Sequence, residues 1–338
     1  MIKKHKYQTL VLLIIISISI SFYSFNNEKI NGICFVAPPH KVNTTHINPI
    51  KEVNASWVAV TPYAFSRPNS PQVTFNQSRQ WRGETEIGAI ETIKAAKKLG
   101  LKVMMKPHIW VMGQGWAGEY DLQNETDWIA WEAAYSKYIL RFARISDSLD
   151  VEMICIGTEY KNVVKKRPQY WIGLIDEIRT FYDGKITYAA NWDNYENVTF
   201  WNKLDYIGID AYFPICDSET PTVDELTEKW QPVLQKLQTF QSKNKKPILF
   251  TEFGYRSMDH SAAGHWEMDN KNAAINLEAQ KNATQAIFNA FWNQEWFAGG
   301  FLWKWHANHT QNGGMDNSHY TPQNKPVQSV IQEWYLTH

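Results

Sequence analysis

The stretch ICIGTEY, Ile154–Tyr160, joins an apolar run to a glycine, a threonine and the carboxylate of Glu159. Runs that are apolar throughout are typical of parallel strands covered on both faces. Removing a carboxylate from water costs several kcal/mol unless a partner compensates for it. We therefore expect a buried parallel strand here, with Glu159 at its carboxyl end for either an ion pair or a chemical role.

Seven more strand-like runs accompany this one, and helical patterns separate most of them. The strand candidates are 32–37, 56–64, 101–110, 151–157, 186–192, 204–212, 246–255 and 299–306, and the helical candidates are 84–99, 124–145, 168–182, 223–241, 277–296 and 327–336. Strands that alternate with helices predict a parallel sheet with crossover helices. Eight such strand–helix units predict an α/β fold, the (β/α)8 TIM barrel, which we expect to form one domain over 30–338. A doubly wound open sheet is the alternative, but no G-x-G-x-x-G follows the first strand and no P-loop motif occurs.

Composition narrows the class of partner. The chain has 34 Lys and Arg against 34 Asp and Glu, so we expect no nucleic-acid partner. Its 16 Trp, 16 Tyr and 16 Phe offer flat apolar faces with polar edges, which suit sugar rings and protein interfaces alike. Cys34, Cys155 and Cys216 are too scattered for a disulfide scaffold or a zinc site, so we expect free thiols. We also expect a monomer.

The N-terminal segment has the features of an export signal. Lys3, Lys4 and Lys6 precede an apolar run from Leu10, which is shorter than the ~20 apolar residues of a membrane span. We expect residues 1–26 to act as a signal peptide that directs export to the periplasm, the cell surface or the medium. The cleavage region has no clean A-x-A pattern, so an uncleaved signal anchor in the membrane is the alternative.

Two glutamates stand where predicted strands leave the core. Glu159 ends the fourth strand and Glu252 ends the seventh, inside ILFTEFGY, and both follow a threonine. The ends of these strands face each other across the mouth of a barrel, and two converging carboxylates are what glycoside hydrolysis requires. One carboxyl must stay protonated while the other stays ionised. Loop caps or ion pairs with lysines are the structural alternative.

Several motifs together resemble glycoside hydrolase family 113, namely GTEY, YAANWDN, FWNKLDYIGIDAYFPI, ILFTEFGY and FLWKWH. The resemblance runs from residue 30 to the C-terminus and implies a retaining (β/α)8 β-mannanase without cofactor, acting on β-1,4-mannosidic linkages in polysaccharide or oligosaccharide. It implies that Glu159 is the acid/base and Glu252 the nucleophile. Many relatives in the wider clan have Asn before the acid/base, to contact the sugar 2-hydroxyl, whereas this chain has Thr158. Asn191 is our candidate for that contact.

Three aromatic residues complete the expected centre of the site. Tyr212 ends the sixth strand, so its hydroxyl can hold Glu252, although a rim position is the alternative. Trp303 and Trp305 share one face of the eighth strand by alternation. We expect one of them, preferably Trp303, to form the floor under the sugar, and the other to pack in the core.

Polar groups of the third strand are candidates for the sugar hydroxyls. Lys106, His108 and Trp110 alternate to one face of 101–110, although a buried, satisfied histidine is the common alternative. Arg82 is a candidate rim contact. The segment HANHTQNGGMDNSH, 306–319, matches no established metal motif, so we expect a loop that walls the sugar groove and no metal.

The residues leave two functional alternatives open. One is a retaining β-glycosidase acting on another β-linked glycan, since no residue named above selects mannose over glucose. The other is a non-catalytic barrel that binds carbohydrate through its aromatic residues.

Overall fold

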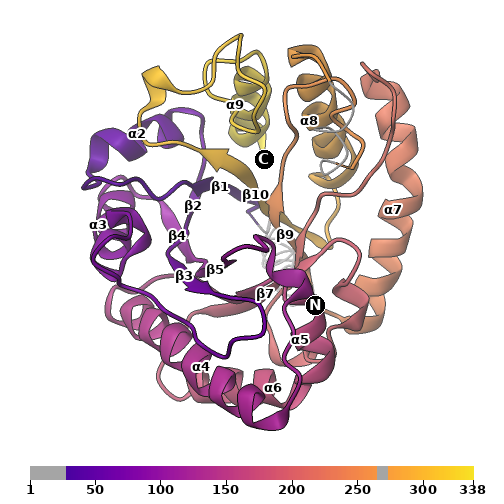
Figure 1. Ribbon diagram of the computed structural model, residues 1–338. Coiled ribbons are helices and arrows are strands. Elements are labelled where there is room, and N and C mark those ends of the chain that lie inside the picture. The colour runs from indigo at the N-terminus through magenta and orange to yellow at the C-terminus, as the bar shows by residue number, and fades with distance from the viewer. Residues whose placement is uncertain (1–27, 265–272) are drawn as a thin grey trace, which may run out of the picture.

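The computed structural model describes residues 28–264 and 273–338. Its core is a closed barrel of parallel strands in the order β1-β10-β9-β8-β7-β6-β4-β2 (Figure 1), which confirms the predicted (β/α)8 fold. The barrel strands are β1 Ile30–Phe35, β2 Trp57–Val60, β4 Lys102–Met105, β6 Met153–Thr158, β7 Lys185–Asn191, β8 Ile207–Asp210, β9 Ile248–Phe253 and β10 Phe297–Trp305.

Two of the expected strands are each divided by a proline. Pro62 separates β2 from β3 (Tyr63–Ser66), and Pro107 separates β4 from β5 (His108–Val111). A proline has no N–H to donate to a strand ladder, so each ladder is interrupted there. β3 and β5 pair with each other in parallel. Because they continue from the carboxyl ends of β2 and β4, they form a small second sheet at that mouth of the barrel.

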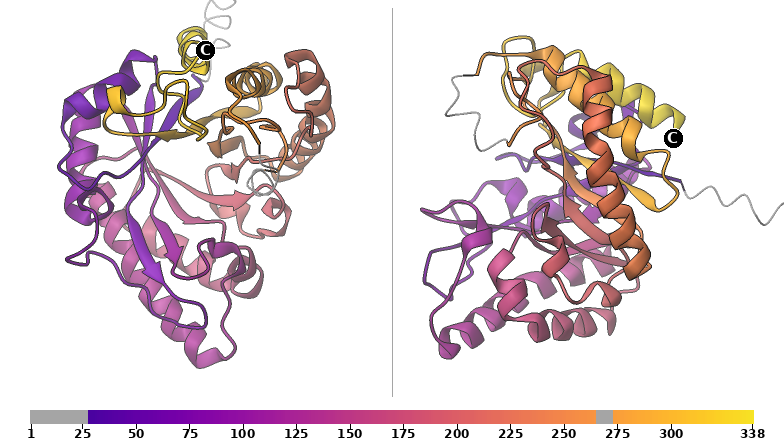
Figure 2. Two further views of the ribbon diagram at one scale, coloured as in Figure 1. Left: turned by 45° about the horizontal axis from the view of Figure 1, so that its top comes forward. Right: turned by 90° about the vertical axis from the view of Figure 1, so that its right-hand side faces the viewer.

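Helices surround the barrel in both orientations of Figure 2. The predicted ones are present as α3 Glu86–Lys98, α4 Glu125–Ser148, α6 Pro168–Arg179, α7 Val223–Asn244, α8 Leu277–Phe291 and α9 Val327–Thr337. Side chains of Thr85, Asn124, Thr222 and Asn276 accept a backbone N–H at the starts of α3, α4, α7 and α8, as N-cap residues do. The short helices α2 (Thr44–Glu52) and α5 (Lys161–Lys166) were not expected.

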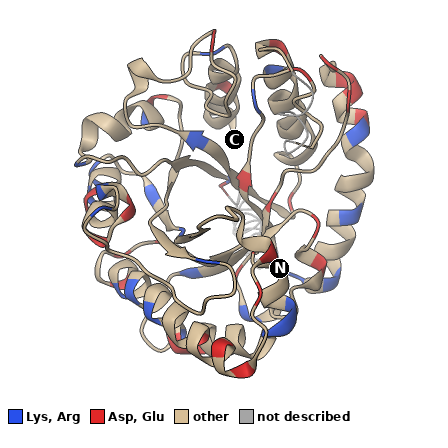
Figure 3. Ribbon diagram, in the orientation of Figure 1, with Lys and Arg blue, Asp and Glu red and all other residues tan. Residues whose placement is uncertain are grey.

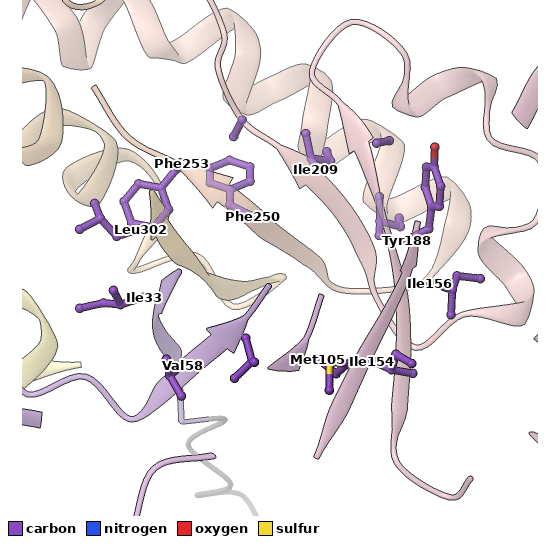
Figure 4. Close-up of a cluster of buried hydrophobic side chains, with 14 of the residues drawn as sticks. Ile33, Val58, Met105, Ile154, Ile156, Tyr188, Ile209, Phe250, Phe253 and Leu302 are labelled. Atoms are coloured by element: carbon purple, nitrogen blue, oxygen red, sulfur yellow. The ribbon is translucent and has the colours of Figure 1, made fainter. Parts of the chain in front are cut away.

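The core has two apolar layers, one inside the barrel and one between strands and helices. Figure 4 shows part of the outer layer, with Ile33 and Met105 among its residues. Their neighbours Cys34 and Met104 belong to the inner layer, as strand alternation requires. The same alternation places the residue after Met105, Lys106, on the interior side, where it is fully buried. Charged residues elsewhere lie mostly on the outer helices (Figure 3).

The three cysteines are free, as predicted; Cys34 and Cys155 are buried and Cys216 is partly buried. Within 28–264 and 273–338, no helix combines the length and apolar character that a membrane crossing needs. The predicted signal or anchor, residues 1–26, lies outside the described residues.

Candidate active site

Glu159 lies one residue beyond β6, where the backbone turns out of the barrel. Its φ is 55°, in the left-handed region that few residues other than glycine adopt, and its backbone N–H donates to the Ala189 carbonyl at 2.8 Å. Trp116 Nε1 donates to Glu159 Oε2 at 2.6 Å. Burial, and then the negative charges of Asp210 and Glu252, raise the pKa of Glu159 well above its usual range. The protonated form is therefore favoured, as a general acid requires.

Glu252 lies on β9, with only 5% of the residue exposed. Tyr212 Oη donates to Glu252 Oε2 at 2.7 Å, and Lys106 Nζ donates to Oε1. Both carboxylate oxygens are thus engaged, which fixes the orientation of the group. The ammonium of Lys106 also compensates for the charge that would otherwise be buried alone.

Lys106 lies below the mouth of the barrel and not at its rim. Its Nζ is 3.5 Å from Asp210 Oδ2 and 3.1 Å from His108 Nε2, in addition to its contact with Glu252. Burial by itself lowers the pKa of Lys106, but the charges of Asp210 and Glu252 raise it well above its usual value. A fully buried ammonium with these partners does not fit the expected role of a donor to sugar hydroxyls. It fits an ion pair with Glu252.

His108 is the neutral member of this group. Burial, together with the charges of Lys106 and Lys304, lowers its pKa well below the usual value. An ammonium has no acceptor, so Nε2 of His108 accepts from Lys106 and Nδ1 carries the proton. The imidazole lies parallel to the Trp303 ring, with centroids 5.9 Å apart and 9° between the planes. His108 thus links the buried charges to an aromatic surface.

Trp303 and Trp305 do not share a face of β10, contrary to expectation. Cys34 of β1 pairs with Trp303 but Phe35 pairs with Trp305, so the register shifts between them and the alternation is interrupted. Trp303 packs against the inner layer and lines a cavity, whereas Trp305 is fully buried in the outer layer and stacks on His309. Trp305 is therefore a core residue, and Trp303 is the one that a sugar can reach.

Two cavities are lined by candidate residues of the site. The Glu159 cavity, of about 490 Å³, is lined by Trp116, Glu159, Lys161, Asn191, Trp192, Asp193 and Tyr212. The Trp303 cavity, of about 330 Å³, is lined by Val36, Ala37, Thr61, Tyr63, Phe65, Trp81, Glu84, Trp110, Trp303 and Lys304. Aromatic side chains with a few polar groups are what carbohydrate sites present. Room for a ligand thus exists beside Glu159 and beside Trp303.

Of the remaining candidate site residues, two line these cavities and one pairs with a glutamate elsewhere. Asn191 lines the Glu159 cavity, where its Oδ1 accepts from the backbone N–H of Trp192 at 2.9 Å. Trp110 lines the Trp303 cavity and is 51% exposed. Arg82 donates to both carboxylate oxygens of Glu91, at 2.9 and 2.6 Å, so it braces the start of α3.

The histidine-rich loop after β10 is held by a glutamine. Gln323 accepts from the His306 N–H at 2.7 Å, donates to the His306 carbonyl at 3.0 Å and lies 3.2 Å from His309 Nδ1. Among the residues that the structure describes, no group of His, Cys, Asp or Glu is arranged to hold a metal ion.

Sequence reasoning missed two groups that touch the site. Asp210 is the last residue of β8, and Glu159 directly follows β6, so the pattern of a carboxylate at the end of an apolar strand was available for Asp210 as well. Trp116 lies in a loop before the short helical turn at Ala117–Glu119, and no local pattern indicates that its indole reaches Glu159, 43 residues away.

Comparisons of sequence and structure find several similar proteins. The sequence profile of glycoside hydrolase family 113 matches residues 40–325. A family 113 β-mannanase from Alicyclobacillus acidocaldarius, solved in complex with ManMIm, is 24% identical, with a TM-score of 0.81 over 93% of this chain and 99% of that one. A family 113 β-1,4-mannanase is 26% identical, with a TM-score of 0.79 over 92% of this chain and 100% of that one.

A more distant likeness shows the fold alone. A β-glucuronidase from Ruminococcus gnavus is 16% identical, with a TM-score of 0.59 over 86% of this chain and 46% of that one. No curated protein sequence matches the chain.

Proposed function

The chain belongs to glycoside hydrolase family 113, and from this we propose that it is a retaining hydrolase of β-1,4-mannosidic linkages in mannan and manno-oligosaccharides. One observation carries the proposal. The protonated form of Glu159 is favoured, and the charge of Glu252 contributes to this. Glu252 itself is held by the buried ammonium of Lys106 and by the hydroxyl of Tyr212. The choice of mannan is supported by the similarity to β-1,4-mannanases.

The proposed first step forms a glycosyl-enzyme. Glu159 donates its proton to the glycosidic oxygen while Glu252 attacks the anomeric carbon, so that the C–O bond to the leaving sugar breaks as an ester bond forms. Lys106 and Tyr212 hold the two Glu252 oxygens in place for this attack. The indole N–H of Trp116 stabilises the carboxylate that Glu159 becomes.

The second step releases the sugar. Glu159, now ionised, takes a proton from water, and the resulting hydroxide attacks the anomeric carbon and displaces Glu252. Two inversions give net retention. Trp303 is the proposed apolar floor beneath the reacting sugar, and Asn191 the proposed partner of its 2-hydroxyl.

Product stereochemistry tests the mechanism directly. The purified chain is incubated with manno-oligosaccharides, and proton NMR follows the anomer that forms first. We expect the β-anomer, which then mutarotates; an α-anomer as first product refutes the retaining mechanism. A panel of β-linked glucans and xylans run in parallel decides the substrate. Activity on another glycan alone overturns the mannan assignment, and binding without turnover of any glycan indicates a non-catalytic barrel.

Azide distinguishes the roles of the glutamates. The Glu252→Ala variant should lose turnover and, with an activated aryl β-mannoside, form an α-mannosyl azide, because azide replaces the missing nucleophile. The Glu159→Ala variant should form the β-mannosyl azide from its glycosyl-enzyme. The exposed Glu196, which pairs with Lys236 on the surface, provides the control Glu196→Ala, which should behave as the wild type. Full activity in Glu252→Ala contradicts our assignment.

We also propose that residues 1–26 direct export and that the exported protein is a monomer. Expression of the full chain, cell fractionation and N-terminal sequencing of the product test the signal, since an intact N-terminus in the membrane fraction indicates an anchor. Light scattering of the purified product tests the monomer.

A further inference from the structure

Asp210 is a fully buried carboxylate that the proposed mechanism does not use. It ends β8 and pairs in register with Glu252 on β9. Its Oδ1 accepts from Thr251 Oγ1 at 2.7 Å, whereas Oδ2 has no hydrogen-bond partner and lies 3.5 Å from Lys106 Nζ. A buried carboxylate oxygen that lies this far from a cation which it shares with Glu252 is only partly compensated, and such an arrangement is costly.

One ammonium here serves two carboxylates. Lys106 donates to Glu252 at hydrogen-bond distance but is farther from Asp210, so the charge of Asp210 is only partly compensated. The groups around Asp210 that carry or can acquire charge come from several strands. They are Lys106 of β4, Glu252 of β9, Tyr212 after β8, Tyr188 of β7, Glu159 and Cys155 of the β6 segment and Cys34 of β1. His108 and Lys304 lie next to these groups, because both interact with Lys106 or Glu252. His108 is neutral and the two thiols are held protonated, because burial lowers the pKa of the former and raises those of the latter.

The strand order sets the separation between Asp210 and Glu159. Asn191 of β7 pairs with Asp210, and Ala189 of the same strand pairs with Thr158 of β6, so a single strand lies between the two carboxyls. Adjacent strands are about 4.8 Å apart, which puts the backbones that carry the two carboxyls roughly 10 Å apart. At that range, inside a buried mouth, two charges still interact appreciably.

We propose that Asp210 is a positioning residue for the catalytic pair. It holds Lys106 beneath Glu252, and its negative charge favours the protonated form of Glu159. The proposal rests on the proposed function, because it assigns Glu159 the acid role. The charge of Asp210 is, after burial, the largest cause that raises the pKa of Glu159. Burial and the charge of Glu252 raise the pKa of Asp210 itself to about 7, so this support grows as the pH rises through neutrality.

The isosteric variant Asp210→Asn removes the charge and keeps an acceptor for Thr251. We expect the protonation midpoint of Glu159 to fall by up to about one pH unit, which is the effect of a fully ionised Asp210 roughly 10 Å away at an effective dielectric constant of about 20. The midpoint is read by NMR of the chain labelled with carboxyl-¹³C glutamate, with the Glu159 signal identified by its loss in Glu159→Gln. This titration needs no substrate, so it tests Asp210 even if the chain hydrolyses no mannan.

A rate profile connects the titration to catalysis. On manno-oligosaccharide, the alkaline limb of kcat/KM should move down by the same amount in Asp210→Asn. With an activated aryl β-mannoside, whose leaving group needs no proton, the alkaline limb should stay in place in Asp210→Asn. A residue that only supports the fold would lower the rate at every pH without moving either limb. The control Asp176→Asn, at an exposed carboxylate paired with Lys203, should leave both profiles unchanged.

A second variant covers the case in which Asp210→Asn does not fold. Thr251→Val removes the hydrogen bond that stabilises ionised Asp210, so it should lower the Glu159 midpoint in the same direction but by less. A folded Asp210→Asn, or failing that a folded Thr251→Val, with an unchanged Glu159 midpoint overturns the proposal.

Discussion

The hydrogen bond from Trp116 to Glu159 gives the sharpest prediction about the acid. The indole N–H donates at 2.6 Å to an oxygen that must be protonated in one step and ionised in the next. Donation favours the ionised form, so this bond lowers the pKa of Glu159 against the effects of burial and nearby charges. Trp116→Phe removes the donor and keeps an aromatic face in the Glu159 cavity. The pKa of Glu159 should therefore rise.

The size of the effect follows from the exposure of the bond. A hydrogen bond to a charged group contributes about 1.5–3 kcal/mol, and 1.36 kcal/mol corresponds to one pKa unit. Trp116 is 38% exposed, so water replaces part of the lost interaction and the low end of that range applies. We expect the alkaline limb of kcat/KM on manno-oligosaccharide to move up by about one pH unit.

The assay is the pH dependence of kcat/KM, measured by release of reducing sugar, for the wild type, Trp116→Phe and a matched control. Trp110→Phe is that control, because it removes an exposed indole from the Trp303 cavity, which Glu159 does not line. It should change KM without moving the limb. An alkaline limb that stays in place or moves down in Trp116→Phe refutes the reasoning.

Three further predictions concern other residues. Tyr212→Phe removes a charge-assisted bond to Glu252 and should lower kcat by about 10- to 100-fold with little change in the midpoint of thermal unfolding. Trp305→Ala should lower the free energy of unfolding by about 3–5 kcal/mol in urea titrations, because the side chain is fully buried. Trp303→Ala should mainly lower kcat/KM, because Trp303 lines a cavity. The reverse pattern contradicts our assignment. Burial lowers the pKa of Lys325 to about 7, whereas an unfolded lysine has a pKa of about 10.4. Between these two pH values the unfolded chain binds more protons at this residue than the folded chain does, so the contribution of Lys325 to the free energy of unfolding rises with pH. The difference in free energy of unfolding between the wild type and Lys325→Met, measured in urea titrations, should therefore shift in favour of the wild type from pH 7 to pH 9. A constant difference contradicts this.

Apolar runs were sufficient to predict the barrel, because a parallel strand covered on both faces must be apolar along its length. They did not predict where strands stop. The breaks at Pro62 and Pro107 are visible locally, yet the pairing of β3 with β5 depends on two segments meeting at the mouth. Pro49 inside α2 is unfavourable for a helix by local rules, and there the Asn43 cap and the burial of Ile47 and Ile50 outweigh it.

For the candidate site, the sequence by itself determined that the two glutamates and Tyr212 lie together, because strand ends in a barrel meet at one mouth whatever the loops do. Only the tertiary structure decided how each group is used. Lys106 is an ion-pair partner and not a sugar contact, because the inward face of β4 buries it between Glu252 and Asp210. A register shift of one residue directs Trp305 into the core and leaves Trp303 in a cavity. Register and burial depend on neighbouring strands, and those neighbours are defined only once the barrel closes.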